Sequence, residues 1–329
     1  MLISPFHEVS ANLLSSRIQA TNDNWRSLNG TISAFVGNIE DSAGIMLDQK
    51  VAVVTGSSSG IGLLTTIELA RDGYFVVATM RDLGRSSRLE EAAQQAGVHD
   101  KLDLRRLDVT DFDSIPGVVD GIVRDHDRID VLINNAGFSV AGFSEDLSLD
   151  DYRRQFETNF FAAVAMSKAA IPTMRRQKSG HIIQVTSIAG RVGTPLLSAY
   201  CSSKHALEGF SESLRIETYS LGIRVVVVEP GAYDTDIWTR NVTVAAGATD
   251  PNSPNKERSQ RFTEWIKGTA QRRRDAREVA RLILRVANDP NPKLRYLIGG
   301  DAKMQVWMRR LLPWHRYERM VAKFVKIDL

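Results

Sequence analysis

The chain alternates short apolar segments with longer amphipathic ones, and this alternation constrains its fold more than any other feature. The short segments are rich in β-branched and apolar residues, as strands buried on both faces are. Repeated strand–helix units build a mostly parallel sheet with right-handed crossovers. We therefore predict an α/β fold with a doubly wound, mostly parallel sheet of about seven strands and helices on both faces.

The expected elements are read directly from this pattern. Strands are predicted at 51–55, 74–79, 102–107, 131–134, 181–186, 223–228 and 294–298. Helices are predicted near 61–72, 85–96, 112–127, 149–174, 197–220 and 275–288. In such sheets ligands bind beyond the carboxyl ends of the strands, so motifs that follow a strand are the ones to judge for function.

A glycine-rich turn follows the first predicted strand and opens the first predicted helix. Residues 55–62 read TGSSSGIG, with glycines at 56, 60 and 62. Glycine lets the backbone turn tightly and approach a pyrophosphate, whose charge then meets the helix N-terminus. Strand, glycines and helix occur in the order that a dinucleotide-binding (Rossmann) fold requires. This predicts cofactor contacts at Gly56, Ser58, Ser59, Gly60 and Ile61.

Tyr200 and Lys204 lie one helical turn apart, so the phenol and the ammonium share a face. A positive charge stabilises a phenolate, and we therefore expect the pKa of Tyr200 below its ordinary value of about 10. Such a tyrosine can donate or accept a proton at neutral pH. The same spacing is also common on solvated helices. A catalytic role for the pair is therefore indicated only by the motifs around it, which include Ser187, thirteen residues upstream of Tyr200.

These motifs together resemble the short-chain dehydrogenase/reductase family, in particular its short single-domain branch, over roughly residues 47–300. The glycine spacing, NNAG at 134–137 and the order of the other motifs carry the resemblance. It implies a catalytic set of four residues and gives each a role. Tyr200 would exchange the proton, Ser187 would hydrogen-bond the substrate oxygen, Lys204 would bind the nicotinamide ribose and lower the tyrosine pKa, and Asn159 would hold a relay water.

The resemblance also implies further cofactor contacts along the carboxyl edge of the sheet. They are Asp108, Val109, Asn135, Ala136, Gly137, Tyr200, Lys204, Pro230, Gly231 and Thr235. Members of this family are usually dimers or tetramers that pair through the helices expected here at 149–174 and 197–220, so we expect a homodimer or homotetramer.

The end of the second predicted strand bears on the choice between NAD and NADP. An acid there hydrogen-bonds the ribose hydroxyls of NAD, whereas a base favours the extra phosphate of NADP. The chain has Met80 where NAD-preferring relatives carry the acid, and Arg81 follows. We predict NADP, with NAD possible. The alternative is that Arg81 only pairs with Asp82 on the surface.

The substrate is less constrained than the cofactor. Besides Ser187, the side chains that follow the strands are largely apolar, and we expect substrate contacts from Phe138, Val140, Val192, Tyr233 and Trp238. The segment at about 233–274 is predicted to be a lid. The resemblance to hydroxysteroid and retinol dehydrogenases favours a lipophilic alcohol, ketone or aldehyde. Two alternatives stay open: an acyl-carrier ketoreductase with Arg191 or Arg240 on the acidic carrier, and a catalytically silent dinucleotide-binding regulator.

The two ends of the chain differ from the predicted domain at 46–300. Residues 1–45 are rich in Ser and Asn, and we expect either a disordered extension or a mis-assigned start, with Met46 the natural one. Residues 301–329 are basic and aromatic, and Pro313 divides them. They could touch a membrane surface or cover the substrate mouth, but packing on the domain or on another subunit is the simpler expectation.

Composition excludes several classes of protein. A net charge of +3 in 329 residues gives no case for a nucleic-acid partner. The single cysteine, Cys201, excludes an internal disulfide framework, fits a reducing, cytoplasmic compartment and has no accompanying metal-ligand cluster, so we predict no metal. No apolar run approaches the roughly 20 residues of a membrane span.

Overall fold

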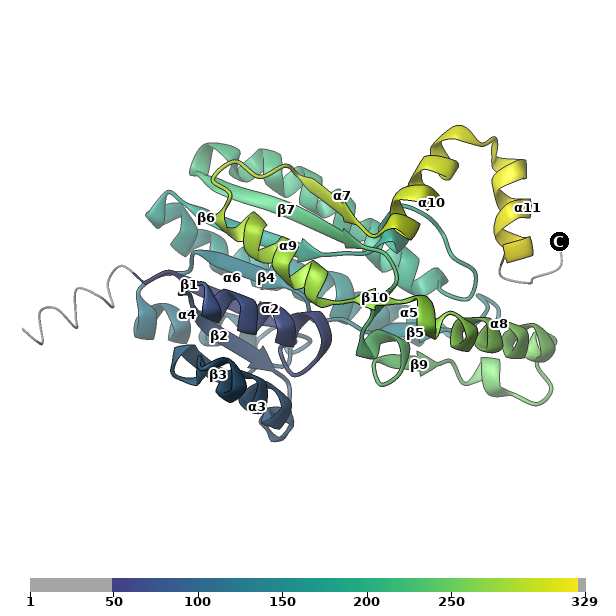
Figure 1. Cartoon of the computed structure of the whole chain (residues 1–329), viewed down its shortest axis with the longest axis horizontal. Coiled ribbons are helices and arrows are strands. Elements are labelled where there is room, and N and C mark those ends of the chain that lie inside the picture. Colours follow the sequence, from purple (N-terminus) through teal and green to yellow (C-terminus); the bar gives the residue numbers. More distant parts are fainter. Residues whose placement is uncertain (1–48, 325–329) are drawn as a thin grey trace, which may run out of the picture. The chain divides into compact units, whose positions relative to one another are not determined.

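The seven predicted strands form one parallel sheet in the computed structural model, which describes residues 49–324. The sheet order is β11-β7-β6-β4-β1-β2-β3 (Figure 1). Its strands are β1 (Val51–Thr55), β2 (Phe75–Met80), β3 (Leu102–Arg106), β4 (Val131–Asn134), β6 (Gly180–Val185), β7 (Ile223–Pro230) and β11 (Arg295–Ile298). The fold prediction is confirmed. The predicted extension at 1–45, including the choice of Met46 as start, lies outside the described residues.

Each strand buries both of its faces, which explains its apolar sequence. In β1 the side chains of Ala52 and Val54 pack with α2 (Gly60–Arg71), α3 (Ser87–Ala96) and α9 (Arg277–Asn288). The alternate residues Val51 and Val53 point to the opposite face and pack in the cluster of α4 (Ser114–His126), α6 (Ala162–Gln177) and α7 (Ser198–Thr218). This period-2 alternation between two apolar layers is the geometry of a sheet covered on both faces.

The order of the strands places a switch point between β1 and β4. From β1 the chain proceeds outward to β2 and β3, and then returns to β4 on the other side of β1. The loops that follow β1 and β4 therefore diverge from adjacent strand ends. In parallel sheets of this kind, ligands bind beyond the carboxyl ends of the strands at such a switch point.

The helix predicted at 149–174 is interrupted. α5 (Leu149–Phe156) begins with a capping box, in which Ser148 and Asp151 bond each other's backbone amides. A single wide turn at Glu157–Phe161, with π-type hydrogen bonds, then joins α5 to α6. Such turns insert a residue into the helical ladder and often occur at functional sites. Asn159 lies in this turn.

The two ends of the segment expected to be a lid pair with each other, and a strand between them pairs with the loop region after β4. β8 (Tyr233–Asp234) pairs with β10 (Arg274–Asp275), and β9 (Val242–Val244) pairs with β5 (Ser139–Ala141). Between them, α8 (Lys256–Gly268) packs Phe262 against Leu196. The function of residues 233–274 as a lid stays a prediction.

Two helices follow the sheet, α10 (Gly300–Leu311) and α11 (Trp314–Phe324), separated at Pro313 (Figure 1). The simpler expectation for this tail was packing on the domain or on another subunit. Four large side chains of the tail do not pack on the domain within residues 49–324, and packing on another subunit stays a prediction. Met304, Trp307, Leu311 and Trp314 are all more than half exposed. None of the helices in residues 49–324 is long and apolar enough to cross a membrane.

Candidate active site

The glycine turn brings three backbone segments into close contact. Gly56 and Gly60 have φ values of +70° and +56°, in the left-handed region that favours glycine. A Cβ on Gly56 would lie 2.9 Å from the Cα of Ala136, and one on Gly62 would overlap the carbonyl oxygen of Gly56. The glycines are therefore required by the packing of the turn itself, and they leave its backbone uncovered at the start of α2.

A threonine that sequence analysis did not single out ties this turn to β4. Thr55 Oγ1 accepts hydrogen bonds from the amides of Asn135 at 3.0 Å and Ala136 at 3.1 Å. The Asn135 side chain returns a bond from Nδ2 to the carbonyl oxygen of Thr55 at 2.9 Å. The ends of β1 and β4 are thereby fixed at the switch point. The adjacency of TG and NNAG to strand ends was the only signal for this contact.

The N-terminus of α2 presents backbone amides of the kind that bind phosphate. Ser59 is the N-cap residue with extended backbone, and its side chain makes no capping hydrogen bond. The first amides of a helix have no intrahelical acceptor, and the helix dipole favours an anion there. Thr235 lies beside this end, because a Cβ on Gly60 would be 3.6 Å from the Thr235 Cβ. The predicted contacts from the two loops are thus brought together.

The side chains after β2 and β3 form a small basic cluster. Met80 is buried, and Arg81 is exposed and forms no ion pair within residues 49–324. The alternative pairing with Asp82 does not occur there, since Asp82 accepts a hydrogen bond from the Gly84 amide at 2.9 Å. Arg106, which sequence analysis missed, joins Arg81 near Asp108.

Asp108 has the carboxylate charge expected for a group near the adenine. Burial favours the neutral acid, but two hydrogen bonds from Thr110, at 2.7 and 3.0 Å, outweigh it. With Arg81 and Arg106 nearby, the net effect lowers the pKa of Asp108. Val109 beside it is buried in the core, so its side chain contributes packing.

Ser187, Tyr200 and Lys204 gather at the carboxyl end of β6. Ser187 caps a short turn at Ile188–Gly190, accepting a hydrogen bond from the Ala189 amide at 3.1 Å. Its side chain also lies near enough to Tyr200 to lower the pKa of that tyrosine. Lys204 Nζ lies 5.7 Å from the centre of the Tyr200 ring and donates to the carbonyl oxygen of Val185 at 2.9 Å. The spacing in sequence therefore does produce a three-residue cluster.

The pKa values of this cluster differ from the sequence-based expectation. Burial raises the pKa of Tyr200 to about 12, although the nearby Ser187 side chain opposes this rise. Burial lowers the pKa of Lys204 to about 8, with the charge of Glu208 opposing. Lys204 therefore loses its proton at a lower pH than Tyr200 does, so it is an ammonium at neutral pH but no longer charged at the high pH where Tyr200 would ionise by itself. The expected lowering of the Tyr200 pKa is wrong for the protein without cofactor.

Asn159 is buried and fully engaged with its neighbours. Its Oδ1 accepts the Phe138 amide at 3.1 Å, and its Nδ2 donates to the Phe138 carbonyl oxygen at 3.0 Å and to Ser203 Oγ at 3.3 Å. It therefore fastens the loop after β4 to the helix that carries Lys204. Its predicted role in holding a relay water stays a prediction.

An ion cluster lies behind Lys204, and sequence analysis missed it. Glu208, one helical turn beyond Lys204, and Glu229 on β7 are both buried. Arg295 on β11 lies 3.0 Å from Glu208 and 3.4 Å from Glu229, while Arg191 bonds Glu229 at 2.9 Å. Burial and the nearby Glu229 charge raise the pKa of Glu208 above its ordinary value. The partners are far apart in sequence, so no local pattern indicated them.

The predicted substrate residues divide into two groups. Val140, Val192 and Tyr233 are buried; Val140 packs with Leu147, and the Tyr233 hydroxyl donates to Glu278 at 3.2 Å. Their burial favours packing over substrate contact. Phe138 and Trp238 are half-buried, and Arg273 stacks on the Trp238 ring at 4.6 Å. The assignment of all five to the substrate stays a prediction.

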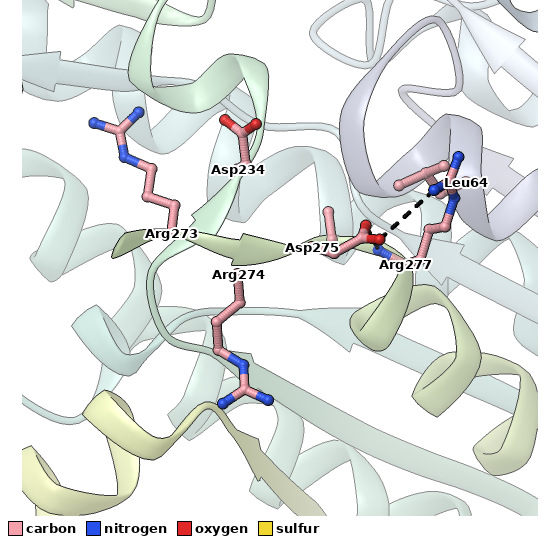
Figure 2. Close-up of a pocket in the computed structure, with 7 residues that line it drawn as sticks. Leu64, Asp234, Arg273, Arg274, Asp275 and Arg277 are labelled. Atoms are coloured by element: carbon pink, nitrogen blue, oxygen red, sulfur yellow. Dashed lines mark hydrogen bonds and ion pairs between the residues drawn. The ribbon is translucent and has the colours of Figure 1, made fainter. Parts of the chain in front are cut away.

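A separate cavity of about 430 Å³ lies between α2 and the β8–β10 pair. It is lined by Leu64, Asp234, Arg273, Arg274, Asp275, Ala276 and Arg277 (Figure 2). Figure 2 shows Arg273 and Arg274 pointing to opposite sides of the chain, with Asp234 on the side of Arg273. Arg274 is paired with Glu278 at 2.9 Å. None of the four predicted catalytic residues, Asn159, Ser187, Tyr200 and Lys204, lines this cavity. The cavity is therefore not the place where the proposed proton transfer would occur.

Comparison with known sequences and structures gives consistent matches. The sequence profile described as short chain dehydrogenase matches residues 50–244. The uncharacterized oxidoreductase YusZ of Bacillus subtilis is 40% identical over 278 residues, covering 84% of this chain and 99% of YusZ. Retinol dehydrogenase 8 of Bos taurus is 36% identical over 256 residues, covering 75% of this chain and 80% of the relative.

Solved structures show the same fold. A short-chain dehydrogenase from Streptomyces avermitilis superposes with a TM-score of 0.71 at 29% identity, covering 85% of this chain and 98% of the other. ElxO, solved with NADP bound, superposes with a TM-score of 0.64 at 25% identity, covering 78% of this chain and 99% of ElxO.

Proposed function

The chain belongs to the short-chain dehydrogenase/reductase family, and from that premise we propose that it is an NADP-preferring oxidoreductase that interconverts an alcohol and its carbonyl compound. The observation that carries this proposal is the cluster at the end of β6. A tyrosine hydroxyl near Ser187, with a lysine ammonium one turn away, is a set of groups that can bind a carbonyl oxygen and protonate it.

The residues present fit a dinucleotide. Gly56 and Gly60 add no side chains at the start of α2, and the first amides of that helix, which have no intrahelical acceptor, suit a pyrophosphate. Asp108 would lie near the adenine, and Gly231 and Thr235 would lie near the nicotinamide. The guanidinium of Arg81, which forms no ion pair within residues 49–324, suits the 2′-phosphate of NADP. ElxO, a structural relative, binds NADP, which supports the same preference here.

The chain's own residues handle the proton. With a pKa of about 12, Tyr200 carries its proton at neutral pH and can donate it from its hydroxyl to a carbonyl oxygen. Ser187 donates a hydrogen bond to the same oxygen and stabilises the charge that develops there. Lys204, with a pKa of about 8, is an ammonium at neutral pH and favours transfer of the tyrosine proton. A bound NADPH would supply the hydride.

We infer that the substrate is lipophilic. The half-buried Phe138 and Trp238 offer apolar surface near the catalytic helix. Retinol dehydrogenase 8 is named for a lipophilic alcohol, and this chain is 36% identical to it. The acyl-carrier alternative is less favoured, because its two candidate arginines already have carboxylate partners: Arg191 pairs with Glu229 at 2.9 Å and Arg240 with Asp236 at 2.6 Å.

One screen separates these possibilities. The purified chain is mixed with NADPH and a panel of aldehydes, ketones and β-ketoacyl thioesters, and reduced-cofactor absorbance is followed. We expect consumption with apolar aldehydes or ketones. Turnover confined to carrier-bound thioesters would support the ketoreductase. Binding of NADPH without turnover across the panel would support the silent regulator and overturn the proposal.

Tyr200→Phe tests the mechanism. Removing the hydroxyl removes the only proposed proton donor, so we expect kcat to fall by at least about 100-fold, the lower range for loss of a general acid. The affinity for NADPH, measured by the quenching of tryptophan fluorescence, should stay nearly unchanged. Tyr219→Phe, at a tyrosine 61% exposed, is the matched control and should keep full activity. Wild-type turnover in Tyr200→Phe would refute the assigned role.

A further inference from the structure

The C-terminal helix pair, α10 and α11, presents large apolar side chains to solvent. Met304, Trp307 and Leu311 are 56%, 64% and 58% exposed, and their spacing of three and four residues puts them on one face of α10. Trp314, at the start of α11, is 57% exposed. Singly exposed apolar residues are ordinary, but this stripe of three large side chains on one helix face, with an exposed tryptophan on the next helix, indicates a binding surface.

The helix pair is a defined element with its own packing. Tyr317 of α11 is 4% exposed, and the Arg309 guanidinium lies 4.7 Å from the ring centre of Trp314 and 5.8 Å from that of Tyr317. At its base, Asp301 accepts the Ala232 amide at 2.8 Å. Figure 1 shows both helices extending away from the sheet. The stripe is therefore held by a folded support and starts next to the loop after β7.

Charge identifies the kind of partner. Lys303 and Arg310 are exposed beside the stripe on the same helix. Residues 300–324 contain six Lys or Arg against Asp301 and Glu318, a net charge of +4. The whole chain carries +3, so all its other residues together carry about −1. The basic excess of the protein is thus concentrated in the helix pair, around its exposed apolar stripe.

We propose that the C-terminal helix pair docks on an anionic lipid surface, lying in the plane of the interface. Tryptophan prefers the boundary between headgroups and acyl chains, and Lys and Arg side chains reach from an apolar face to lipid phosphates. A second copy of the chain is a poorer partner, because two such faces would bring like charges together. Neither helix would cross the bilayer.

Docking would also orient the rest of the molecule. The base of α10 adjoins Gly231, since a Cβ on that glycine would lie 2.5 Å from Asp301 Oδ1. The carboxyl edge of the sheet would thus lie next to the lipid. Lipid binding itself does not depend on the proposed enzymatic function, because its test measures binding and not turnover.

The test uses the full-length protein and sedimentation with vesicles. One set is phosphatidylcholine alone, and the other contains equal parts of phosphatidylcholine and phosphatidylglycerol. We expect binding to the anionic vesicles at low salt, a blue shift of tryptophan emission, and loss of binding at high salt as the charges are screened. Trp307→Ala with Trp314→Ala, and separately Lys303→Glu with Arg310→Glu, should each weaken binding about tenfold or more.

A matched control separates this surface from charge in general. Arg281→Glu with Arg285→Glu makes the same charge change at exposed positions of α9 and should retain binding. Circular dichroism verifies that every variant is folded. The proposal is overturned if wild type fails to bind anionic vesicles at low salt, or if the α9 control loses as much binding as the α10 variant. A dimer that the tryptophan variant dissociates, without vesicle binding by wild type, would assign the stripe to a second copy.

Discussion

At the scale of single residues, burial decides the chemistry of the catalytic cluster. Tyr200 and Lys204 are close enough to influence each other, yet burial moves their pKa values apart, to about 12 and about 8. Both shifts favour the uncharged forms, because a buried site disfavours charge. At neutral pH the tyrosine is therefore a proton donor. The lysine is a buried ammonium, and the loss of its hydration lowers the free energy of unfolding.

That cost predicts a pH-dependent stability. Between about pH 8 and 10 the unfolded chain binds more protons at Lys204 than the folded chain does, so the free energy of unfolding should rise with pH by up to about 3 kcal/mol. Tyr200 contributes only above about pH 10, since its folded pKa is raised. Lys204→Met should abolish the rise. Urea unfolding without cofactor at pH 7 and 9.5 measures it.

The control for this measurement is Lys168→Met, at an exposed lysine of α6. Its stability should differ from that of wild type by the same amount at both pH values. Lys204→Met also loses the hydrogen bond to Val185, which changes its free energy of unfolding. That change should be the same at pH 7 and at pH 9.5. A difference between wild type and Lys204→Met that is equal at both pH values would contradict the cost assigned to the buried ammonium.

Cofactor choice also belongs to the residue scale. Arg81 has no ion-pair partner within residues 49–324, so its guanidinium is free for a phosphate. Arg81→Ala should raise the KM for NADPH roughly 10- to 100-fold, the range for losing one charge-assisted hydrogen bond, and leave that for NADH nearly unchanged. Steady-state kinetics with both cofactors measures this. Arg71→Ala, at the other end of α2, is the control; improved efficiency with NADPH in Arg81→Ala would reverse the assignment.

At the scale of elements, α7 joins the catalytic cluster to the sheet. Lys204, Glu208 and Glu212 follow one another at four-residue intervals on one face of the helix. Arg295 of β11 reaches two of them, Glu208 at 3.0 Å and Glu212 at 2.6 Å. The helix that presents Tyr200 is therefore fastened to the edge strand by one arginine. The Glu208 carboxylate that Arg295 bonds is buried, whereas the Glu212 carboxylate is exposed at the surface.

These two bonds should differ in energy. Arg295→Met would leave Glu208 and Glu229 buried with less compensation, so we expect a loss of about 3–5 kcal/mol in unfolding free energy at pH 7. The loss should shrink as pH falls and Glu208 takes up a proton, because its pKa is already raised. Glu212→Ala removes a surface bond to the same arginine and should cost under about 1 kcal/mol. Denaturant unfolding of both variants measures this, and equal losses would count against the buried cluster.

At the scale of the whole molecule, the single cysteine reports on global opening. Cys201 is 6% exposed on α7, its Sγ accepts the Thr194 amide at 3.4 Å, and burial raises the pKa of its thiol. Reaction with disulfide reagents requires an accessible thiolate. In the native protein both the burial of Cys201 and the raised pKa of its thiol therefore slow the reaction. The exposed Leu149, Phe161 and Ile216 lie on or between the helices of the expected subunit contact. The oligomeric state stays a prediction.

We expect thiol labelling of the native protein to be slow and to accelerate in urea together with the loss of circular dichroism. NADP at 100 times its Kd should stabilise the fold by about 2.7 kcal/mol and slow labelling by about 100-fold. Ellman's reagent measures the rate. Rapid labelling in buffer would mean that α7 opens locally, and labelling insensitive to NADP would show that opening does not involve the cofactor site.

Local pattern predicted the fold, and resemblance to a known family supplied the candidate site. The alternation of apolar segments predicted all seven strands of the sheet, because strand and helix periods are set by near neighbours. Helical spacing placed Tyr200 and Lys204 on one face, while the resemblance added Ser187 and Asn159 to them. Only the tertiary structure decided the pKa values of Tyr200 and Lys204, since burial depends on the whole packed domain. It also decided the pairing of Glu208 with Arg295 across 87 residues, and the exposure of the apolar stripe on α10. Contacts between distant segments leave no local periodicity, so no spacing could reveal them.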